Sequence, residues 1–404
     1  MSTEPLADEG HLRDLAREPG RQVWIGRHPP YDFVSLPLRG CTNFRVSSAH
    51  HGRYDVVWYY EESPADLRPG QHELVFDELV RLIGARGRLV VRVPGKIPHF
   101  NIVGLKNLLG RRYQTQVSVE SEAVADATTV VFDVERKGID RYRSDEWTFA
   151  VLTRGTRVSN VVELCRSIRD QDPDRRHEIL VWGPDDPAYE PYGVTCHDPG
   201  YRDHLAEISR KKNDLACRAA RPNLLIVHDR YRLDPGFFTG FARFGYDFDF
   251  VTVPQRYECG TPFPAYVATD THELGTGQPI DCRDYDMIRP GQYINGGLII
   301  AKTETLRDIR LNDLLFWNQW EDVELARQFR HQGLPPRVNC FSAATTLGID
   351  PSYTSGFLSD SPPAIEIRRD VAAIGAGIAQ TLLAGGRKLE QRMRPMFRRL
   401  AGRA

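Results

Sequence analysis

The chain has 404 residues, of which 41% are hydrophobic and 26% are charged, and its formal net charge is -1. This length exceeds one ordinary hydrophobic core, so two or three domains are expected, and the composition excludes a disordered chain. The near-zero charge excludes an electrostatic attraction of the whole protein to nucleic acid or to a membrane.

The seven cysteines are scattered and contain no C-x-x-C pair. An odd count without regular spacing favours reduced thiols in a cytoplasmic protein over a disulfide framework or a zinc site. Residues 1–19 form an acidic, polar leader that lacks the apolar core of a signal peptide. No stretch is long and apolar enough to span a bilayer, so any contact with a membrane is expected to be peripheral.

The segment after the leader carries the pattern of an α/β domain. Residues 54–60 (YDVVWYY) predict a buried strand, and residues 71–84 place apolar side chains at helical spacing. We expect Gly84 or Gly87 to end this helix, because glycine adopts the left-handed stop conformation at little cost. Residues 89–93 (LVVRV) predict the next strand, and the three elements together predict a parallel βαβ unit.

From residue 54 to about residue 136 this order resembles the second half of a Rossmann-like class I methyltransferase. That family places a G-x-G-x-G loop upstream to admit S-adenosylmethionine, but Gly26, Gly40 and Gly52 lack the required spacing. We therefore predict that residues 20–137 form a truncated, cofactor-free methyltransferase-like domain that serves packing or partner binding. A working methyltransferase is the alternative.

A second α/β pattern follows. Residues 146–152 (EWTFAVL) predict a strand, a basic loop and a helix come next, and residues 177–182 (HEILVW) predict another strand. This opening resembles family 2 glycosyltransferases, whose GT-A fold is a Rossmann-like nucleotide-diphospho-sugar transferase fold. The resemblance implies that Thr153 and Arg154 lie at the carboxyl end of the first strand, where a basic residue can face the uracil or diphosphate of a donor. An ordinary surface loop is the alternative.

The next apolar strand, residues 223–227 (NLLIV), runs into His228-Asp229-Arg230, and a predicted helix with Lys212 and Asn213 precedes it. In the family, a Lys/Arg-x-Asn element and a D-x-D-like motif stand at these places, so the resemblance implies that these five residues bind the donor.

The chemistry of the donor diphosphate leaves three readings of this motif open. His228 and Asp229 could hold Mn²⁺ or Mg²⁺ that bridges the phosphates. Alternatively no metal is used and Arg230 or Arg232 neutralises the leaving diphosphate directly, or Asp229 only forms a structural ion pair with Arg230. Arg230 departs from the family pattern because it cannot be a metal ligand, and residues 337–347 lack the histidine that completes the metal shell in related enzymes.

Residues 231–250 are rich in aromatic side chains, which predict either core packing or a wall for an acceptor sugar. Residues 257–286 show little periodicity and predict a functional loop or lid.

The strand start 293–301 (YINGGLIIA) and the helix start Glu321-Asp322 give the sharpest pattern. They resemble inverting GT-A enzymes, in which a glycine-bearing strand precedes a Glu-Asp pair. The resemblance implies that Gly296 and Gly297 approach the donor sugar, that Asp322 is the general base and that Glu321 orients the acceptor. Two aromatic side chains, Trp317 and Trp320, would wall the acceptor site. Acidic residues that only stabilise a helix start are the alternative.

After residue 361, residues 364–404 predict a basic helical tail that could lie on anionic lipid and suit a lipid-linked acceptor. A solvated or oligomerising helix is the alternative.

We therefore expect a GT-A glycosyltransferase domain over residues 145–361 that moves a sugar from a nucleoside diphosphate to a hydroxyl acceptor. A catalytically inactive carbohydrate-binding or scaffolding protein is the main alternative.

Overall fold

The computed structural model describes residues 10–352, except residues 69, 96–100, 125–126, 201–205, 270–278, 282–291 and 317–318. The chain divides into two compact units, Met1–Pro351 and Ser352–Ala404. The predicted basic tail and Trp317 therefore lie outside the described residues. Within the described part of the chain, no helix is long and apolar enough to cross a membrane.

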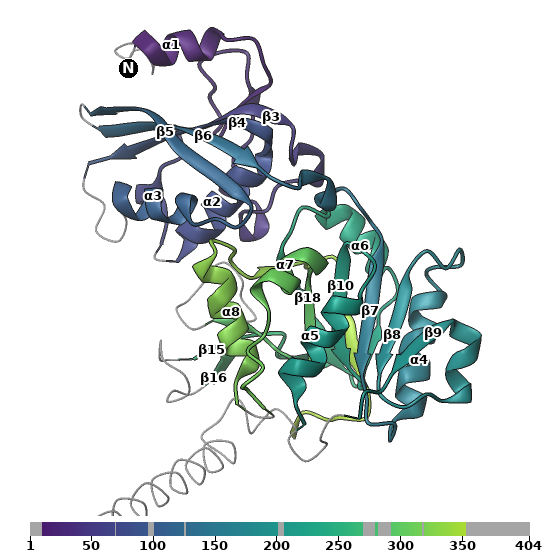
Figure 1. The fold of residues 1–404 in the computed structure, drawn as a ribbon. Coiled ribbons are helices and arrows are strands. Elements are labelled where there is room, and N and C mark those ends of the chain that lie inside the picture. Colours follow the sequence, from purple (N-terminus) through teal and green to yellow (C-terminus); the bar gives the residue numbers. More distant parts are fainter. Residues whose placement is uncertain are drawn as a thin grey trace, which may run out of the picture. The chain divides into compact units, whose positions relative to one another are not determined.

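The first sheet of the larger unit has six strands in the order β2-β1-β3-β4-β6-β5 (Figure 1). The first four neighbours in this order are parallel, and β6 runs antiparallel to both β4 and β5. The strands are β1 (Gln22–Trp24), β2 (Val34–Ser35), β3 (Tyr54–Tyr59), β4 (Ile83–Pro94), β5 (Thr115–Val124) and β6 (Ala127–Arg136). The helices are α1 (Gly10–Arg17), α2 (Gln71–Leu82) and α3 (Ile102–Gly110).

The predicted βαβ unit is present as β3, α2 and β4, but the prediction that a glycine ends the helix is wrong. Helix α2 ends at Leu82, and Gly84 and Gly87 lie inside β4. A Cβ atom on Gly87 would lie 2.6 Å from the carbonyl oxygen of Asp55. This glycine is needed because another backbone passes close to it.

The central sheet has seven strands in the order β19-β12-β18-β10-β7-β8-β9. Its strands are β7 (Trp147–Leu152), β8 (Glu178–Trp182), β9 (Val194–His197), β10 (Asn223–His228), β12 (Phe250–Thr252), β18 (Leu298–Lys302) and β19 (Arg337–Val338). Its helices are α4 (Val158–Arg169), α5 (Ile208–Arg218), α6 (Phe237–Phe244), α7 (Thr303–Ile309) and α8 (Glu321–His331).

Strands β9, β8, β7 and β10 are parallel, whereas β18 is antiparallel to β10 and β12. Following the chain, β8 and β9 are added on one side of β7, and the next strand, β10, pairs with the other side of β7 (Figure 1). The point between β7 and β10 is a topological switch point, where open α/β sheets bind ligands at the carboxyl ends of their strands. The expected α/β, Rossmann-like class is confirmed by this arrangement.

Strand β7 is buried on both faces, as its unbroken apolar sequence predicts. Phe149 and Val151 belong to a core with helices α4 and α6, whereas Ala150 and Leu152 belong to a core with α5 and α8. Burial of each large apolar side chain contributes about 1.5–3 kcal/mol. The two cores fix β7, and hence the residues that follow it, from both sides.

The aromatic residues 231–250 serve the first of these cores. The rings of Trp147 and Phe241 are 4.7 Å apart in an edge-to-face contact, and the α6 side chains Phe237, Phe241 and Phe244 are buried. The core reading of this segment therefore holds for α6.

Two small sheets complete the unit. One has the order β11-β20-β13-β14 and the other β16-β15-β17. Their strands are β11 (Tyr231–Leu233), β13 (Gln255–Tyr257), β14 (Pro262–Phe263), β15 (Tyr266–Thr269), β16 (Pro279–Asp281), β17 (Tyr293–Ile294) and β20 (Ala344–Thr346). The prediction of an irregular loop over residues 257–286 is thus wrong where β14, β15 and β16 form, because backbone pairing requires no side-chain periodicity in such short strands.

Buried ion pairs join the first sheet's helix α2 to the central sheet. The Arg81 guanidinium, 1% exposed, contacts Asp77 at 3.0 Å, Asp247 at 2.7 Å and Asp249 at 3.0 Å. From β19, Arg337 Nε donates to Asp77 Oδ2 at 2.8 Å. Removing one partner of a buried pair typically costs about 3–5 kcal/mol, because the remaining charge is left without compensation.

Candidate functional site

The carboxyl ends of β7 and β10 bring Thr153 and Asp229 together. The Thr153 hydroxyl donates a hydrogen bond to Asp229 Oδ2 at 2.8 Å, and the Asp229 backbone N–H donates to the Leu152 carbonyl at 3.1 Å. Thr153 is buried, and the Asp229 side chain is 13% exposed. The switch point therefore carries a fixed carboxylate, with Arg154 exposed on the same loop.

Two arginines surround this carboxylate. Arg157, at the start of α4, donates to Asp229 Oδ1 at 3.3 Å, and its side chain is half exposed. Arg230 follows Asp229, and its guanidinium lies next to Gly297, where an added Cβ would come within 3.0 Å of Nη2. The sequence pattern missed Arg157, although the second arginine of the TRGTR loop, so close to the end of β7, was the available signal.

Arg157 and Arg230 form a basic cluster, and His228 is a neutral histidine beside them. Burial, followed by the positive charges of Lys212, Arg230 and Arg157, lowers its pKa well below the usual value. Its backbone N–H donates to the Gly297 carbonyl at 3.0 Å, and its buried Nε2 has no hydrogen-bond partner among the described residues. The imidazole therefore brings an unsatisfied polar atom to the end of β10.

Gly296 and Gly297 are close to other side chains of the site. A Cβ on Gly296 would lie 3.0 Å from Asp322 Cβ and from Glu321 Oε1, and a Cβ on Gly297 would lie 3.0 Å from the Tyr231 hydroxyl. Larger residues would push these groups apart. The glycine pair thus allows the basic cluster and the acidic pair, Glu321 and Asp322, to approach the same short stretch of backbone.

The acidic pair is held by hydrogen bonds at the start of α8. Lys212 is fully buried on α5, and its ammonium donates to Glu321 Oε1 and to the Gly296 carbonyl, both at 2.9 Å. The Gly296 N–H donates to Asp322 Oδ2 at 2.9 Å, and the Val323 N–H donates to Asp322 Oδ1 at 2.9 Å. Lys212 therefore binds the acidic pair rather than standing open to a phosphate.

Asp322 has the ionisation behaviour of a base that works near neutral pH. Burial, and then the adjacent Glu321 carboxylate, raise its pKa to about 7, although Lys212 and the two backbone N–H groups favour the charged form. A base is most effective when its pKa lies near the operating pH. The sequence predicted the position of this carboxylate but gave no measure of its basicity.

Asn213 and Trp320 fix the segment that leads into α8. The Asn213 amide donates to the Leu311 carbonyl at 2.8 Å and accepts from the Leu311 N–H at 2.9 Å. Trp320 is partly buried and has a left-handed backbone with φ of 66°, which is uncommon for a residue with a bulky side chain. Asn213 therefore positions a neighbouring segment, and Trp320 turns the chain just before Glu321.

The residues present do not fit a metal ion held by the protein alone. The described residues contain no group of three or more His, Cys, Asp and Glu side chains that could hold a metal. Both Asp229 oxygens already accept hydrogen bonds, from Thr153 and Arg157. Three neighbouring cations also act on His228. This environment suits an anion better than a divalent cation.

The corresponding end of the first sheet is closed by a carboxylate. Glu61, which follows β3, accepts hydrogen bonds from the Trp24 indole and the His28 N–H at 2.8 Å, and from the Arg27 N–H at 3.1 Å. Although partial burial opposes ionisation, these bonds lower the pKa of Glu61 to about 2. The backbone groups after β1, where a cofactor loop would offer its amides, are already occupied.

No protein-family model and no curated protein matches the chain. Among solved structures, residues 1–349 of S. aureus TarS in complex with UDP-GlcNAc match with a TM-score of 0.35 and 14% identity, over 51% of this chain and 60% of that chain. The mannosyltransferase PcManGT from Pyrobaculum calidifontis, in complex with GDP-Man and Mn²⁺, matches with a TM-score of 0.35 and 13% identity, over 52% of this chain and 59% of that chain. The chain thus spans about 60% of the length of each. Likeness at this level carries no information on the activity of this chain.

Proposed function

We propose that the chain is an inverting glycosyltransferase that moves a sugar from a nucleoside-diphosphate donor to a hydroxyl acceptor. The acceptor oxygen attacks the anomeric carbon and forms the new C–O bond. The bond between that carbon and the diphosphate breaks, and the electron pair leaves with the diphosphate. The acceptor proton passes to Asp322.

One observation carries this proposal. Asp322, a carboxylate with a pKa of about 7, lies against Gly296, and the basic cluster at the switch point of the central sheet lies against the next residue, Gly297. A sugar hydroxyl is a poor nucleophile near neutral pH, so a base must accept its proton as it attacks. A departing diphosphate gathers negative charge, which positioned cations stabilise. The acid–base group and the anion-stabilising groups are therefore the two parts that this reaction requires.

We assign the diphosphate to the basic cluster, with Arg157 and Arg230 as direct partners. Guanidinium groups match phosphate oxygens with two parallel hydrogen bonds. Asp229 would then orient Arg157, and Glu321 would hold the acceptor beside Asp322. If a divalent cation accompanies the donor, Asp229 and His228 are the groups that would face it, and most of its ligands would come from phosphate and water.

The decisive experiment measures sugar transfer and donor hydrolysis over a panel of uridine, guanosine and thymidine diphosphate sugars. We expect activity with at least one donor, and its loss in Asp322→Asn. Glu324→Gln is the matched control, because Glu324 lies on the same first turn of α8 but hydrogen-bonds Asn312 rather than the Gly296 backbone. Equal activity of Asp322→Asn and wild type would overturn the assignment of the base.

A non-catalytic carbohydrate-binding or scaffolding protein is the second candidate. The observation that favours it is the pairing of Asp229 with Arg157, which already compensates the charge of this carboxylate. This candidate predicts that calorimetry detects sugar or nucleotide-sugar binding while no donor is turned over.

A further inference from the structure

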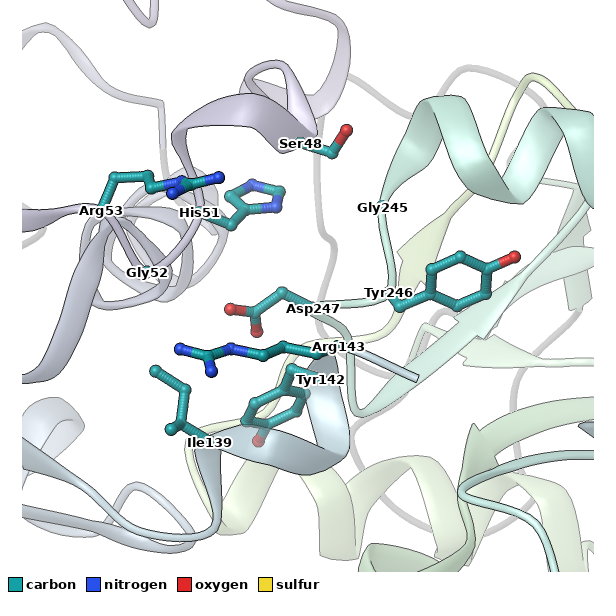
Figure 2. A pocket seen from close by; sticks show the side chains of 10 residues that line it. All are labelled: Ser48, His51, Gly52, Arg53, Ile139, Tyr142, Arg143, Gly245, Tyr246 and Asp247. Atoms are coloured by element: carbon teal, nitrogen blue, oxygen red, sulfur yellow. The ribbon is translucent and has the colours of Figure 1, made fainter. Parts of the chain in front are cut away.

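A polar cavity lies where the first sheet meets the central sheet. Its volume is about 490 Å³, and Figure 2 shows the ten residues that line it. They come from the segment before β3, from the residues before β7 and from the turn before β12. A volume of this size falls within the range of small-molecule sites.

The cavity presents two cations. Both Arg53, just before β3, and Arg143, in the segment before β7, line it (Figure 2). Arg53 is exposed, and among the described residues its guanidinium has no hydrogen-bond or ion-pair partner. The Arg143 side chain is 72% exposed, and its ion-pair partner within the described part of the chain is the solvent-facing Asp140 at 3.3 Å. The acidic residue of the lining, Asp247, is already compensated by Arg81 and Arg136. The cavity therefore has an excess of positive charge.

Neutral polar groups form the rest of its polar wall. The His51 side chain, 6% exposed, contacts Glu78 through Nε2 at 2.9 Å. Burial, and then the charge of Arg45, lower the pKa of His51, so the ring is neutral at pH 7. Because Glu78 accepts the Nε2–H, Nδ1 is left as an acceptor, and it has no partner among the described residues. Ser48 adds a hydroxyl-bearing side chain to the lining, and Tyr246 also lines the cavity, but its hydroxyl points away from the other lining side chains (Figure 2).

We propose that this cavity binds a small phosphorylated sugar or polyol. Arg53 and Arg143 would bind the phosphate, because two guanidinium groups offer it paired, charge-assisted hydrogen bonds. The ligand hydroxyls would exchange hydrogen bonds with Ser48 and donate one toward His51 Nδ1. The Tyr246 ring and Ile139 would contact the apolar side of the ligand.

This cavity is separate from the candidate active site. Arg143 precedes β7, whereas Thr153 follows it, so the two sites lie at opposite ends of that strand. Six residues of β-strand span about 20 Å. A ligand bound here would act as an effector or as a second recognition site, and it would not contact the groups that we assign to transfer.

Isothermal titration calorimetry on the full chain tests the proposal with four probes: glycerol 3-phosphate, glucose 6-phosphate, inorganic phosphate and glucose. We expect one of the two phosphorylated polyols to bind, at least tenfold more tightly than inorganic phosphate, and glucose not to bind. The variants Arg53→Ala and Arg143→Ala should each weaken binding by about tenfold or more, since hydrogen bonds to charged groups contribute that much. Both side chains are exposed at the surface, so neither change removes core packing.

Arg111→Ala is the matched control, because Arg111 is an exposed arginine on the first part of the chain that does not line the cavity. It should bind like wild type. Binding that Arg53→Glu leaves unchanged would overturn the assignment, as would equal affinity for inorganic phosphate and for both phosphorylated polyols. Absence of heat with all four probes would mean that the cavity holds only water. None of these outcomes depends on sugar transfer, because Arg53 and Arg143 lie outside the proposed catalytic machinery.

Discussion

The two main sheets of the protein have parallel strands of similar make-up, yet their carboxyl ends differ. In the first sheet, Glu61 accepts the backbone N–H groups after β1 and fills the place where a ligand would meet them. In the central sheet, the corresponding edge carries Asp229, two arginines, an unsatisfied His228 and the acidic pair on α8. Two sheets of similar architecture therefore differ at the strand ends, where a few side chains either close the ligand edge or leave charged groups on it.

The largest effect is expected for a substitution of Asp322, the proposed general base at the edge of the central sheet. Asp322→Asn removes the proton acceptor while the size of the side chain is kept, although only one of the two backbone N–H groups that Asp322 accepts can still be accepted, so kcat should fall by about 10²–10⁴. Donor affinity, measured by calorimetry, should change little. A fall in donor affinity with unchanged kcat would assign Asp322 to binding instead.

The next largest effect concerns the basic cluster. Arg230→Met should weaken donor binding by about ten- to a hundredfold, because hydrogen bonds to a charged group are lost. In wild type, donor affinity should persist in EDTA, since the described residues hold no metal cluster of their own. Loss of donor binding in EDTA, restored by Mn²⁺, would contradict direct neutralisation and favour a metal bridge through Asp229 and His228.

The pH dependence of the transfer rate tests whether Asp322 is the base. Because the pKa of Asp322 is raised to about 7, the rate should rise with pH below 7 and level off above it as the carboxylate loses its proton. Lys212→Met removes a cation that favours the charged form, so the midpoint should move upward by about one pH unit. A purely structural role of Lys212 would lower the rate without moving the midpoint.

The smallest effect is expected in the first sheet. Glu61→Gln replaces an acceptor of several hydrogen bonds and should destabilise the fold by about 1–3 kcal/mol in urea unfolding. Since the folded-state pKa of Glu61 is depressed to about 2, its contribution to stability should be present above the ordinary glutamate pKa and be lost as the pH falls toward 2. The variant should still show no heat with S-adenosylmethionine. Binding of that cofactor by wild type would restore the methyltransferase alternative.

Much of the fold follows from the sequence. The apolar runs that became β7 and β10, and the glycine-bearing turn before β18, could be read directly, because buried parallel strands need unbroken apolar residues. The strands of residues 257–286 could not be read, since their pairing depends on backbone hydrogen bonds. The glycines in β4 were assigned to a helix stop because the close approach of Asp55 is a tertiary contact.

The candidate site was only partly predictable. The positions of Asp229, Gly296, Gly297 and Asp322 came from the family resemblance of their motifs, and the structure brings them to one edge of the sheet. The partners of Lys212 and Asn213 could not be foreseen, because each contacts residues about 80 to 110 positions away in the sequence. Arg157 was missed for the same reason, since its carboxylate partner lies 72 positions further on.

The buried ion pairs around Arg81 bear on how the protein can be divided. A cut between residues 137 and 145 would separate Arg81 from Asp247 and Asp249, and would leave each fragment with buried charges that lack their partners. Neither fragment is therefore expected to be soluble and folded when expressed alone, and the intact chain should melt in one cooperative transition. The first sheet would then be required for the folding of the central sheet, whether or not it binds a ligand of its own.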